Sequence, residues 1–481
     1  MAFYDGFISK LSDTDAANSN ISNIASSIDK FFKFVGLKKH LKSCGMCSFN
    51  GYSALLIFSC VFILSFLRQN IYRQYVEVRN EMIQKDAIYG FLKTSKFNWE
   101  LLVQKVALSL YMFMDFLTSE TRDTVLCLDD SDSQKNSSKE IELTARQYDH
   151  VNDLYYLGYK FLALTWNDGC STVPVDSRLM SSSNDKNRVP IKNEKSNLDK
   201  RSNGFKRRDE SMKTKLEVGY RMVVSAIKKG FKATALTFDS WYAKSSFIIK
   251  CSKLIPVVCR VPMSEKSQYW FKGKKLWCQG IYRSLSKKAT KNKPASALIM
   301  VEDSEGNKIK AKLVFIINRV SGGLITLLST DTSFSCEKII KLYSMRWSIE
   351  NFFRDIKQFL DFRTGYQGTD YDGQTAYVSI VMIRYMFLSY EARKSVDGRT
   401  IGSLFHCCCN EVEEWQFEEA LDIIFAHIND IIEESDDKET IIRKIRQYQN
   451  FIRTHGYKIF KESAFPKLFG IKTDNAIQYI C

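Results

Sequence analysis

The segment between residues 343 and 357 places a glutamate among several cations at regular spacing. The residues concerned are Tyr343, Arg346, Glu350, Arg354 and Lys357. On an α-helix, which turns by about 100° per residue, these five side chains fall within an arc of roughly 80°. Apolar side chains of the same segment occupy a separate arc of about 120°, wide enough to bury one side of a helix. The spacing therefore predicts a firmly packed helix that presents a glutamate among cations and a phenol.

Glu350 has two interpretations on these grounds. Oppositely charged residues four positions apart, such as Glu350 and Arg354, are common on solvated helix faces and require no function. Two other acids favour a catalytic interpretation, because Asp129 and Asp239 each follow a short apolar run of strand character. Successive acids are separated by 110 and 111 residues, so only the fold can bring the three carboxylates together.

Three convergent carboxylates would form a site made only of hard oxygen ligands, which suits Mg²⁺ or Mn²⁺. Two such ions can activate an attacking oxygen and stabilise a leaving oxygen during in-line attack on a phosphodiester. Neighbouring Arg and Lys side chains would hold the phosphates on either side of the reacting bond. The residue types therefore favour metal-dependent chemistry on a nucleic-acid backbone.

The spacing Y-x2-R-x3-E-x6-K, read at Tyr343, Arg346, Glu350 and Lys357, is similar to the signature of the insertion-sequence-four transposases. These are bacterial DDE enzymes with a ribonuclease-H-like catalytic core. A β insertion between the second Asp and the Glu is a further feature of that family. The resemblance spans roughly residues 120–365.

The runs LDDS at 128–131 and FDSW at 238–241 resemble the family segments that carry the first and second acids. Within the first run, Asp129 and Asp130 are both candidates. Alternate residues of a strand face opposite ways, so only one of them can face the metals. The family pattern has an Asp two residues before Ser or Thr, which favours Asp129 because Ser131 follows it.

The resemblance implies cut-and-paste DNA transposition. Water first frees a 3′-hydroxyl at the transposon end; that hydroxyl cuts the other strand through a hairpin and then joins target DNA. Asp129, Asp239 and Glu350 would bind the metal, expected as two Mg²⁺ or Mn²⁺ ions. The expected DNA-binding residues are Tyr343, Arg346, Arg354 and Lys357, together with Trp270 or Trp277 of the β insertion for stacking on a flipped base. Both tryptophans are also suited to ordinary packing.

Composition agrees with a large nucleic-acid-binding protein. The 481 residues carry a formal net charge of +16, which favours a polyanionic partner. Hydrophobic residues make up 45% and charged residues 26%, which excludes a wholly disordered chain. By resemblance, the partners are double-stranded DNA of the terminal inverted repeats and of the target, bound by a homodimer without a small-molecule cofactor. The thirteen cysteines and the lack of a recognisable signal peptide indicate reduced, cytoplasmic thiols, and the family implies association with the nucleoid.

Strand-like runs that alternate with helical segments predict an α/β fold with a ribonuclease-H-like core. The expected order is a helical DNA-binding module at 1–118, the first part of the core at 119–261, a mainly antiparallel β insertion at 262–335, the last part of the core at 336–400 and a helical C-terminal module at 401–481, a candidate for dimerisation. Within the core, residues 181–215 are polar and basic, with nine Lys and Arg between residues 186 and 208. This stretch suits either a solvated loop or an arm that follows DNA.

Two rival functions remain open. A catalytically inert descendant of a transposase would bind DNA without cutting it, although all three acids are retained. A basic membrane-surface protein is the second rival, because the 17 residues from Gly51 to Leu67 carry no charge. That segment suits a buried core helix or a span at the lower limit of bilayer thickness.

Overall fold

The computed structural model describes residues 23–66, 68–72, 83–118, 121–136, 140–149, 153–189, 197–290, 293–318 and 322–394, with residues 401 and 442. Apart from these last two, the expected C-terminal module lies outside the described residues, as does part of the basic stretch at 190–196. The chain divides into two compact units, one formed by residues 1–32, 66–69 and 399–481, the other by residues 33–65 and 70–398. All residues predicted to do chemistry belong to the second, larger unit.

The N-terminal third of the described chain is mainly helical, as expected. Its helices are α2 (Asn23–Phe34), α3 (Leu37–Ser43), α4 (Ala54–Ile63), α5 (Lys85–Leu92) and α6 (Trp99–Phe116), with a small hairpin of β1 (Ser48–Phe49) and β2 (Tyr52–Ser53). Residues 54–63 of the uncharged segment form α4; most of these ten residues are buried, and the Ser53 hydroxyl caps the helix. None of the helices described is both long and apolar enough to cross a membrane.

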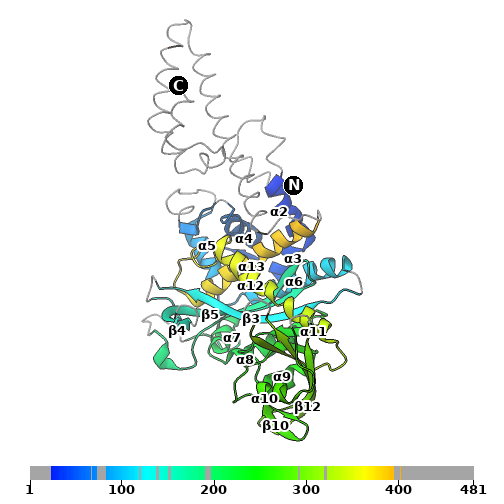
Figure 1. Cartoon of the computed structure of the whole chain (residues 1–481). Coiled ribbons are helices and arrows are strands. Elements are labelled where there is room, and N and C mark those ends of the chain that lie inside the picture. The colour runs from blue at the N-terminus through cyan, green and yellow to red at the C-terminus, as the bar shows by residue number, and fades with distance from the viewer. Residues whose placement is uncertain are drawn as a thin grey trace. The chain divides into compact units, whose positions relative to one another are not determined.

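One large mixed sheet organises the rest of the unit (Figure 1). Its first strands are β3 (Val125–Gln134), β4 (Ala145–Asp149), β5 (Leu154–Asn167), β6 (Thr172–Met180), β7 (Ala235–Phe238) and β8 (Val257–Arg260). Strand β3 is parallel to β7, and β7 is parallel to β8, whereas β3, β4 and β6 each pair with β5 in antiparallel fashion. The protein is therefore a mixed α/β protein.

The segment 262–335 extends this sheet. It contains β9 (Gln268–Phe271), β10 (Lys274–Trp277), β11 (Ala295–Glu302), β12 (Lys308–Ile317) and β13 (Leu324–Ser329), with α10 (Cys278–Ser284). Their mutual pairings are antiparallel, as the turn signals predict. Because β13 also pairs with β8, the strand order runs β10-β9-β11-β12-β13-β8-β7-β3-β5-β4 without interruption. The outer strands are thus a continuation of the central sheet.

Helices cover both faces of the sheet. They are α7 (Asn203–Ser211), α8 (Lys215–Lys228), α9 (Ser245–Ser252), α11 (Cys336–Ser344), α12 (Trp347–Gln358) and the long, buried α13 (Tyr371–Lys394), with a 3₁₀ turn at Asp185–Asn187. Helix α8 approaches β3 closely at Gly219, where a Cβ would lie 2.8 Å from Leu128 Cδ2. Helix α12 packs against β3 and β6.

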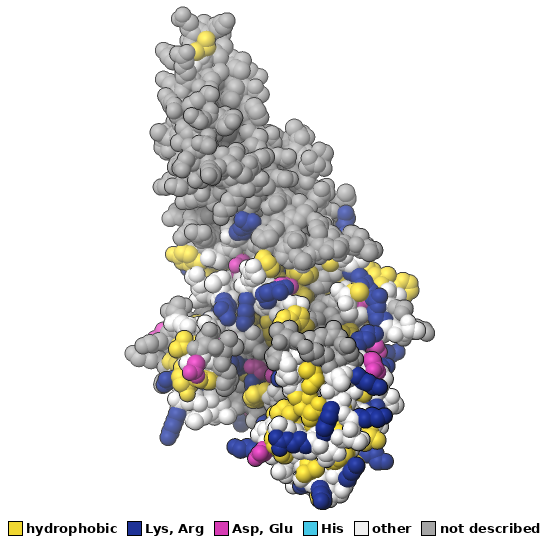
Figure 2. Space-filling view, in the orientation of Figure 1, with side chains coloured by type: hydrophobic (Ala, Val, Ile, Leu, Met, Phe, Trp, Pro, Cys, Tyr) yellow, Lys and Arg dark blue, Asp and Glu magenta, His cyan; other side chains and the backbone are white. Residues whose placement is uncertain are grey.

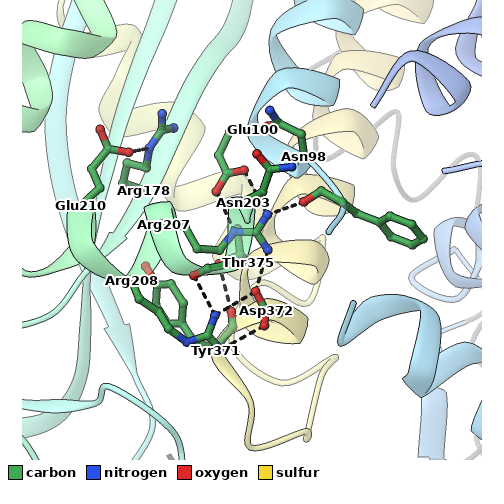
Figure 3. Close-up of polar contacts among 12 residues, drawn as sticks. Asn98, Glu100, Arg178, Asn203, Arg207, Arg208, Glu210, Tyr371, Asp372 and Thr375 are labelled. Atoms are coloured by element: carbon green, nitrogen blue, oxygen red, sulfur yellow. Dashed lines mark hydrogen bonds and ion pairs between the residues drawn. The ribbon is translucent and has the colours of Figure 1, made fainter. Parts of the chain in front are cut away.

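The expectation of a basic loop at 181–215 is partly wrong, because residues 203–211 form α7. Two of its basic residues, Arg207 and Arg208, are buried. Both pair with the fully buried Asp372 at the start of α13 (Figure 3). Arg208 also pairs with Glu142. These arginines are part of the packed interior, so they are not free to follow DNA.

Candidate active site

The first acid lies in the middle of β3. The sequence predicts that this strand ends at Asp129, but β3 continues to Gln134 because its antiparallel partner β5 accompanies it that far. Its parallel partner β7 stops earlier, at Phe238, which is in register with Leu128. Asp129 and Asp239 therefore each directly follow one member of the registered pair Leu128 and Phe238 on two adjacent parallel strands.

One face of β3 is directed towards the α11–α12 segment. Asp129 Oδ2 accepts a hydrogen bond from Arg346 Nη1 at 3.0 Å. Two residues further along, Ser131 Oγ accepts one from Lys357 Nζ at 2.5 Å. Because residues two apart share a face of a strand, Arg346 and Lys357 approach β3 from the same side.

Asp130 is directed to the opposite face of β3. Its Oδ1 accepts hydrogen bonds from Lys215 Nζ at 2.6 Å and from Tyr242 Oη at 2.5 Å. Lys215 begins α8, so α8 and α12 lie on opposite sides of the sheet at this point. Of the two adjacent acids, Asp129 is the one on the side of Glu350.

Like charge accumulates around Asp129. Burial, together with the neighbouring Asp239 and Asp130 carboxylates, raises the pKa of its carboxyl to about 7, although Arg346 opposes this rise. The Asp239 carboxylate accepts the backbone N–H of Trp241 at 2.9 Å. The negative charges of Asp129 and Asp239 lie close enough to repel each other, so a cation bound between them would be stabilised.

The predicted single helix from 343 to 357 is interrupted. Helix α11 ends at Ser344 and α12 begins at Trp347. Across the junction the backbone hydrogen bonds join residues three positions apart, where an α-helix joins residues four apart. Arg346 N–H donates to Tyr343 O and Ile349 N–H donates to Arg346 O, each at 3.1 Å. This is 3₁₀ geometry, which tightens the turn and changes the angular positions expected for an α-helix.

The predicted apolar side of this segment is confirmed for most of its members. Buried residues are Ile349, Phe352, Phe353, Ile356 and Leu360, whereas Met345 and Phe359 are only partly buried. The interruption therefore leaves the packing of α12 on the sheet intact while it repositions residues 343–346.

Arg346 connects two of the three predicted acids. Its Nη1 pairs with Asp129 at 3.0 Å, and its Nη2 pairs with Glu350 Oε1 at 2.5 Å. The guanidinium lies 5.5 Å from the centre of the Tyr343 ring. Its Nε is buried without a hydrogen-bond acceptor in the part of the chain that the structure describes. The fold thus gathers Asp129, Glu350 and Tyr343 around one arginine.

The residues present fit a divalent metal in donor chemistry. Asp129 and Asp239 supply hard carboxylate oxygens, the ligands that Mg²⁺ and Mn²⁺ prefer. Among the described residues no group of three or more His, Cys, Asp or Glu side chains is arranged to hold a metal ion. The Glu350 carboxylate is paired with the Arg346 guanidinium at 2.5 Å.

The other predicted DNA-binding residues have different surroundings. Lys357 is partly buried, and burial with the nearby Arg363 and Lys160 lowers its pKa to about 8. Arg354 is exposed and pairs with its neighbour Asp355 at 3.1 Å. Lys357 therefore belongs to the surroundings of β3, while Arg354 lies at the surface of α12.

The two predicted stacking tryptophans do not lie beside the acids. Trp270 is on β9 and Trp277 ends β10, and five strands separate β9 from β3 in the sheet. At a strand spacing of about 4.8 Å, six strand steps correspond to roughly 29 Å. Trp270 instead donates its indole N–H to Glu302 at 2.8 Å.

Two exposed tryptophans adjacent to motif residues were not singled out by sequence reasoning. Trp241 follows Asp239 by two positions and is 45% exposed, with Lys215 Nζ 3.7 Å from its ring centre. Trp347 follows Arg346 directly and is 60% exposed. Their adjacency to the motifs was the available signal, although only the structure shows that both are exposed.

Comparisons with known proteins give a family. The chain matches the model of the DDE superfamily endonucleases over residues 63–303, just over half of its length, a match that includes Asp129 and Asp239 and ends before Glu350. No curated protein matches the chain significantly.

Among solved structures, the chain has a distant likeness to the "Drosophila P element transposase strand transfer complex". Identity is 12%, the TM-score is 0.22, and the match covers 54% of this chain and 55% of that one. The likeness thus involves about half the length of that protein and is too weak to inform the fold. The family model matches independently of this structural likeness, and on that match the chain belongs to the DDE superfamily endonucleases.

Proposed function

We propose that the protein is a DNA transposase that cuts and joins DNA at the inverted repeats of its own element. The observation that carries this proposal is the arrangement around β3. Asp129 and Asp239 follow registered residues of parallel strands, and Arg346 joins Asp129 to Glu350. The three acids of the predicted triad come from segments far apart in sequence, and a solvated helix face would not require such convergence.

The strand arrangement supports a ribonuclease-H-like core. The order β6-β5-β3-β7-β8 has three antiparallel strands followed by two that are parallel to β3. In this core the proposed first acid lies on the central strand and the second follows its parallel neighbour. Helix α12 brings the proposed third acid to the same side of β3.

Divalent ions held by Asp129, Asp239 and Glu350 would supply a Lewis acid for attack on a phosphodiester. The chain itself supplies cations for the phosphates. Arg346, only 13% exposed in its side chain, and Lys357 approach β3 from the side of Asp129. In this proposal, Arg346 orients Glu350 and Asp129 before DNA binds and then contacts a phosphate, as does Tyr343 beside it.

The proposed reaction sequence is hydrolysis at the transposon end, hairpin formation and transfer of the 3′-hydroxyl to target DNA. Hairpin formation requires an unpaired base to leave the stack, at a cost of a few kcal/mol. The exposed Trp241 and Trp347 are better placed to stack on such a base than Trp270 or Trp277, because they are adjacent to Asp239 and Arg346 in the chain.

The test is cleavage of a plasmid that carries the element's own terminal repeats, with Mg²⁺ and with EDTA. We expect metal-dependent release of the flanking DNA, which is lost in Asp129→Asn, Asp239→Asn and Glu350→Gln. Asp130→Asn is the matched control, because its carboxylate faces α8. Full activity of Glu350→Gln would refute the site assignment. An active Asp129→Asn with an inactive Asp130→Asn would move the first acid by one position.

An inert descendant predicts a different result in the same experiment. The wild-type protein would then bind the terminal repeats without cutting them at any concentration of Mg²⁺ or Mn²⁺. Dimer formation on DNA is a separate part of the proposal, and the mass of the complex with two terminal repeats tests it.

A further inference from the structure

The outer strands of the sheet expose one face. Strands β9 and β10 pack against α10, and β11 packs against α9, so helices cover one side. On β12, Lys308, Lys310 and Lys312 alternate with buried or partly buried residues, which directs all three lysines to the other side. Paired strands place further residues on that side, namely Leu298, Met300 and Glu302 of β11, Trp270 of β9 and Lys275 of β10.

This face is the same face of the sheet that carries Asp129. Residues in register share a face, and the pairings connect Cys127 to Thr237, Thr237 to Val258, Val258 to Ser329 and Ser329 to Lys312. Cys127 lies two residues before Asp129, on the same side of β3. Lys312 Nζ donates to Phe334 O, just before α11, which agrees with this assignment.

Positive charge is concentrated in the outer strands. Residues 262–318 contain 12 Lys and Arg against four Asp and Glu, a net charge of +8, which is half of the charge of the whole chain. Figure 2 shows Lys and Arg side chains over the end of the unit where Figure 1 places β10 and β12, with few acids among them. Cations at this density repel one another, and a bound polyanion would relieve that repulsion.

An aromatic ring lies at the centre of the lysines. The ammonium groups of Lys275 and Lys308 lie 5.2 Å and 5.0 Å from the centre of the Trp270 ring. Glu302 accepts hydrogen bonds from the Trp270 indole and pairs with both lysines at 2.6 Å and 3.1 Å. Glu302 thus fixes the arrangement of Trp270, Lys275 and Lys308. Lys310, two residues after Lys308 on β12, is exposed and has no ion pair among the described residues.

Protection of a sheet edge does not account for this pattern. Lysines often prevent edge strands from pairing with other chains, and β10 is such an edge. Strand β12, however, lies between β11 and β13, so its backbone is already paired on both sides. Its three outward lysines, beside a tryptophan and the 64% exposed Leu298, require another explanation.

We propose that this face, defined by Lys275, Lys308, Lys310, Lys312 and Trp270, binds the phosphate backbone of double-stranded DNA. The inference rests on the proposed function, which makes DNA the substrate. Strand β12 is four strand steps from β3, about 19 Å at the usual spacing, on the same face of the sheet. On this face α11 packs against β8 and β13, between β3 and β12. DNA held at the acids would therefore pass over α11 and reach the lysines roughly six base pairs away, at about 3.4 Å per base pair.

The experiment measures the affinity of the full-length protein for a duplex of about 30 base pairs without terminal repeats, in EDTA and over a range of KCl concentrations. Each lost phosphate contact lowers the slope of log affinity against log salt by about 0.9. We expect this decrease in Lys310→Gln and about twice as much in Lys275→Gln/Lys310→Gln. Lys250→Gln is the control, because the exposed Lys250 lies on α9, which packs against the opposite side of β11.

Equal slopes for the wild type and all variants would overturn the inference, as would a wild type that binds anionic phospholipid vesicles through Lys310 but not the duplex. The two proposals fail separately. Loss of plasmid cleavage with Lys310-dependent binding intact contradicts only the catalytic proposal. Metal-dependent cleavage with an unchanged salt slope in Lys310→Gln contradicts only this one.

Discussion

Arg208 and Arg346 each join two carboxylates from distant parts of the chain, yet the two guanidinium groups have different surroundings. Arg208 donates to Glu142, Asp372 and the Gly204 carbonyl, so that all five of its N–H groups have acceptors. Arg346 donates to Asp129 and Glu350, and its buried Nε has no acceptor among the described residues.

The carboxylates differ in the same way. Asp372 is fully buried and Glu142 nearly so, and both face cations. The Asp129 side chain is 16% exposed and that of Glu350 33%, and Asp129 faces two like charges, Asp239 and Asp130. Removing one partner from a satisfied, buried ion cluster destabilises a fold, whereas an incompletely satisfied cluster beside like charges remains able to bind something else. Each prediction below tests whether this difference holds.

The largest expected effect on stability is at Asp372. Asp372→Ala leaves Arg207 and Arg208 buried with too few partners, which costs about 3–5 kcal/mol of unfolding free energy. Urea denaturation followed by circular dichroism measures this loss. Glu391→Ala, which removes an ion pair with Lys394 on the same helix, is the control and changes stability by less than about 1 kcal/mol. Equal effects of the two substitutions would mean that the Arg208 cluster has no special structural role.

The next effect concerns the metal. If Asp129 and Asp239 bind a divalent cation, saturating Mn²⁺ or Mg²⁺ stabilises the folded chain by about 2.7 kcal/mol at a hundred times the dissociation constant. Thermal unfolding with the ion and with EDTA measures it. The stabilisation disappears in Asp129→Asn and persists in Glu391→Ala, which leaves the acids of β3 and β7 untouched. A shift of the same size in Asp129→Asn would place the metal elsewhere.

The positions of Asp129 and Asp239 were easier to predict from the sequence than the burial of Arg207 and Arg208. Short apolar runs before Asp129 and Asp239 indicate buried strands, and the role proposed for the two acids rests on their position beyond those runs. Arg207 and Arg208 stand among other basic residues in a polar stretch, and nothing local distinguishes a buried arginine from a solvated one. Their burial depends on Asp372 and Glu142, which are distant in sequence.

The side-chain directions around Arg346 and the register of the sheet strands could not be predicted from the sequence either. An α-helix from 343 to 357 describes the packing of Ile349 and Phe352 correctly, but the 3₁₀ junction at Arg346 arises from how the segment packs on the sheet. The face occupied by Lys310 depends on four successive strand pairings. Such long-range registers are set by tertiary contacts, so the individual strands were predictable and their common face was not.

A smaller effect of opposite sign is expected at Asp129. Above pH 7, where the Asp129 carboxyl is mostly ionised, Asp129→Asn removes a charge that Asp239 and Asp130 repel. The metal-free protein then becomes more stable by about 1–2 kcal/mol, the order of repulsion between partly solvated charges. Denaturation in EDTA measures this gain. Glu142→Gln, the equivalent neutralisation beside Arg208, lowers stability instead. Destabilisation by Asp129→Asn would show that its pairing with Arg346 outweighs the repulsion, and that the two clusters are alike.

The smallest effect on stability is expected at Glu350. Its side chain is one-third exposed and its pair with Arg346 is within one helix turn, so solvent screens the interaction, and Glu350→Gln changes the unfolding free energy by less than about 1 kcal/mol. The same substitution abolishes DNA cleavage under the proposed function. Denaturation and plasmid cleavage on one preparation measure both. A residue whose loss stops the reaction while the fold is unaffected has been placed by the fold for chemistry. A stability loss of several kcal/mol would instead make Arg346 a structural arginine like Arg208.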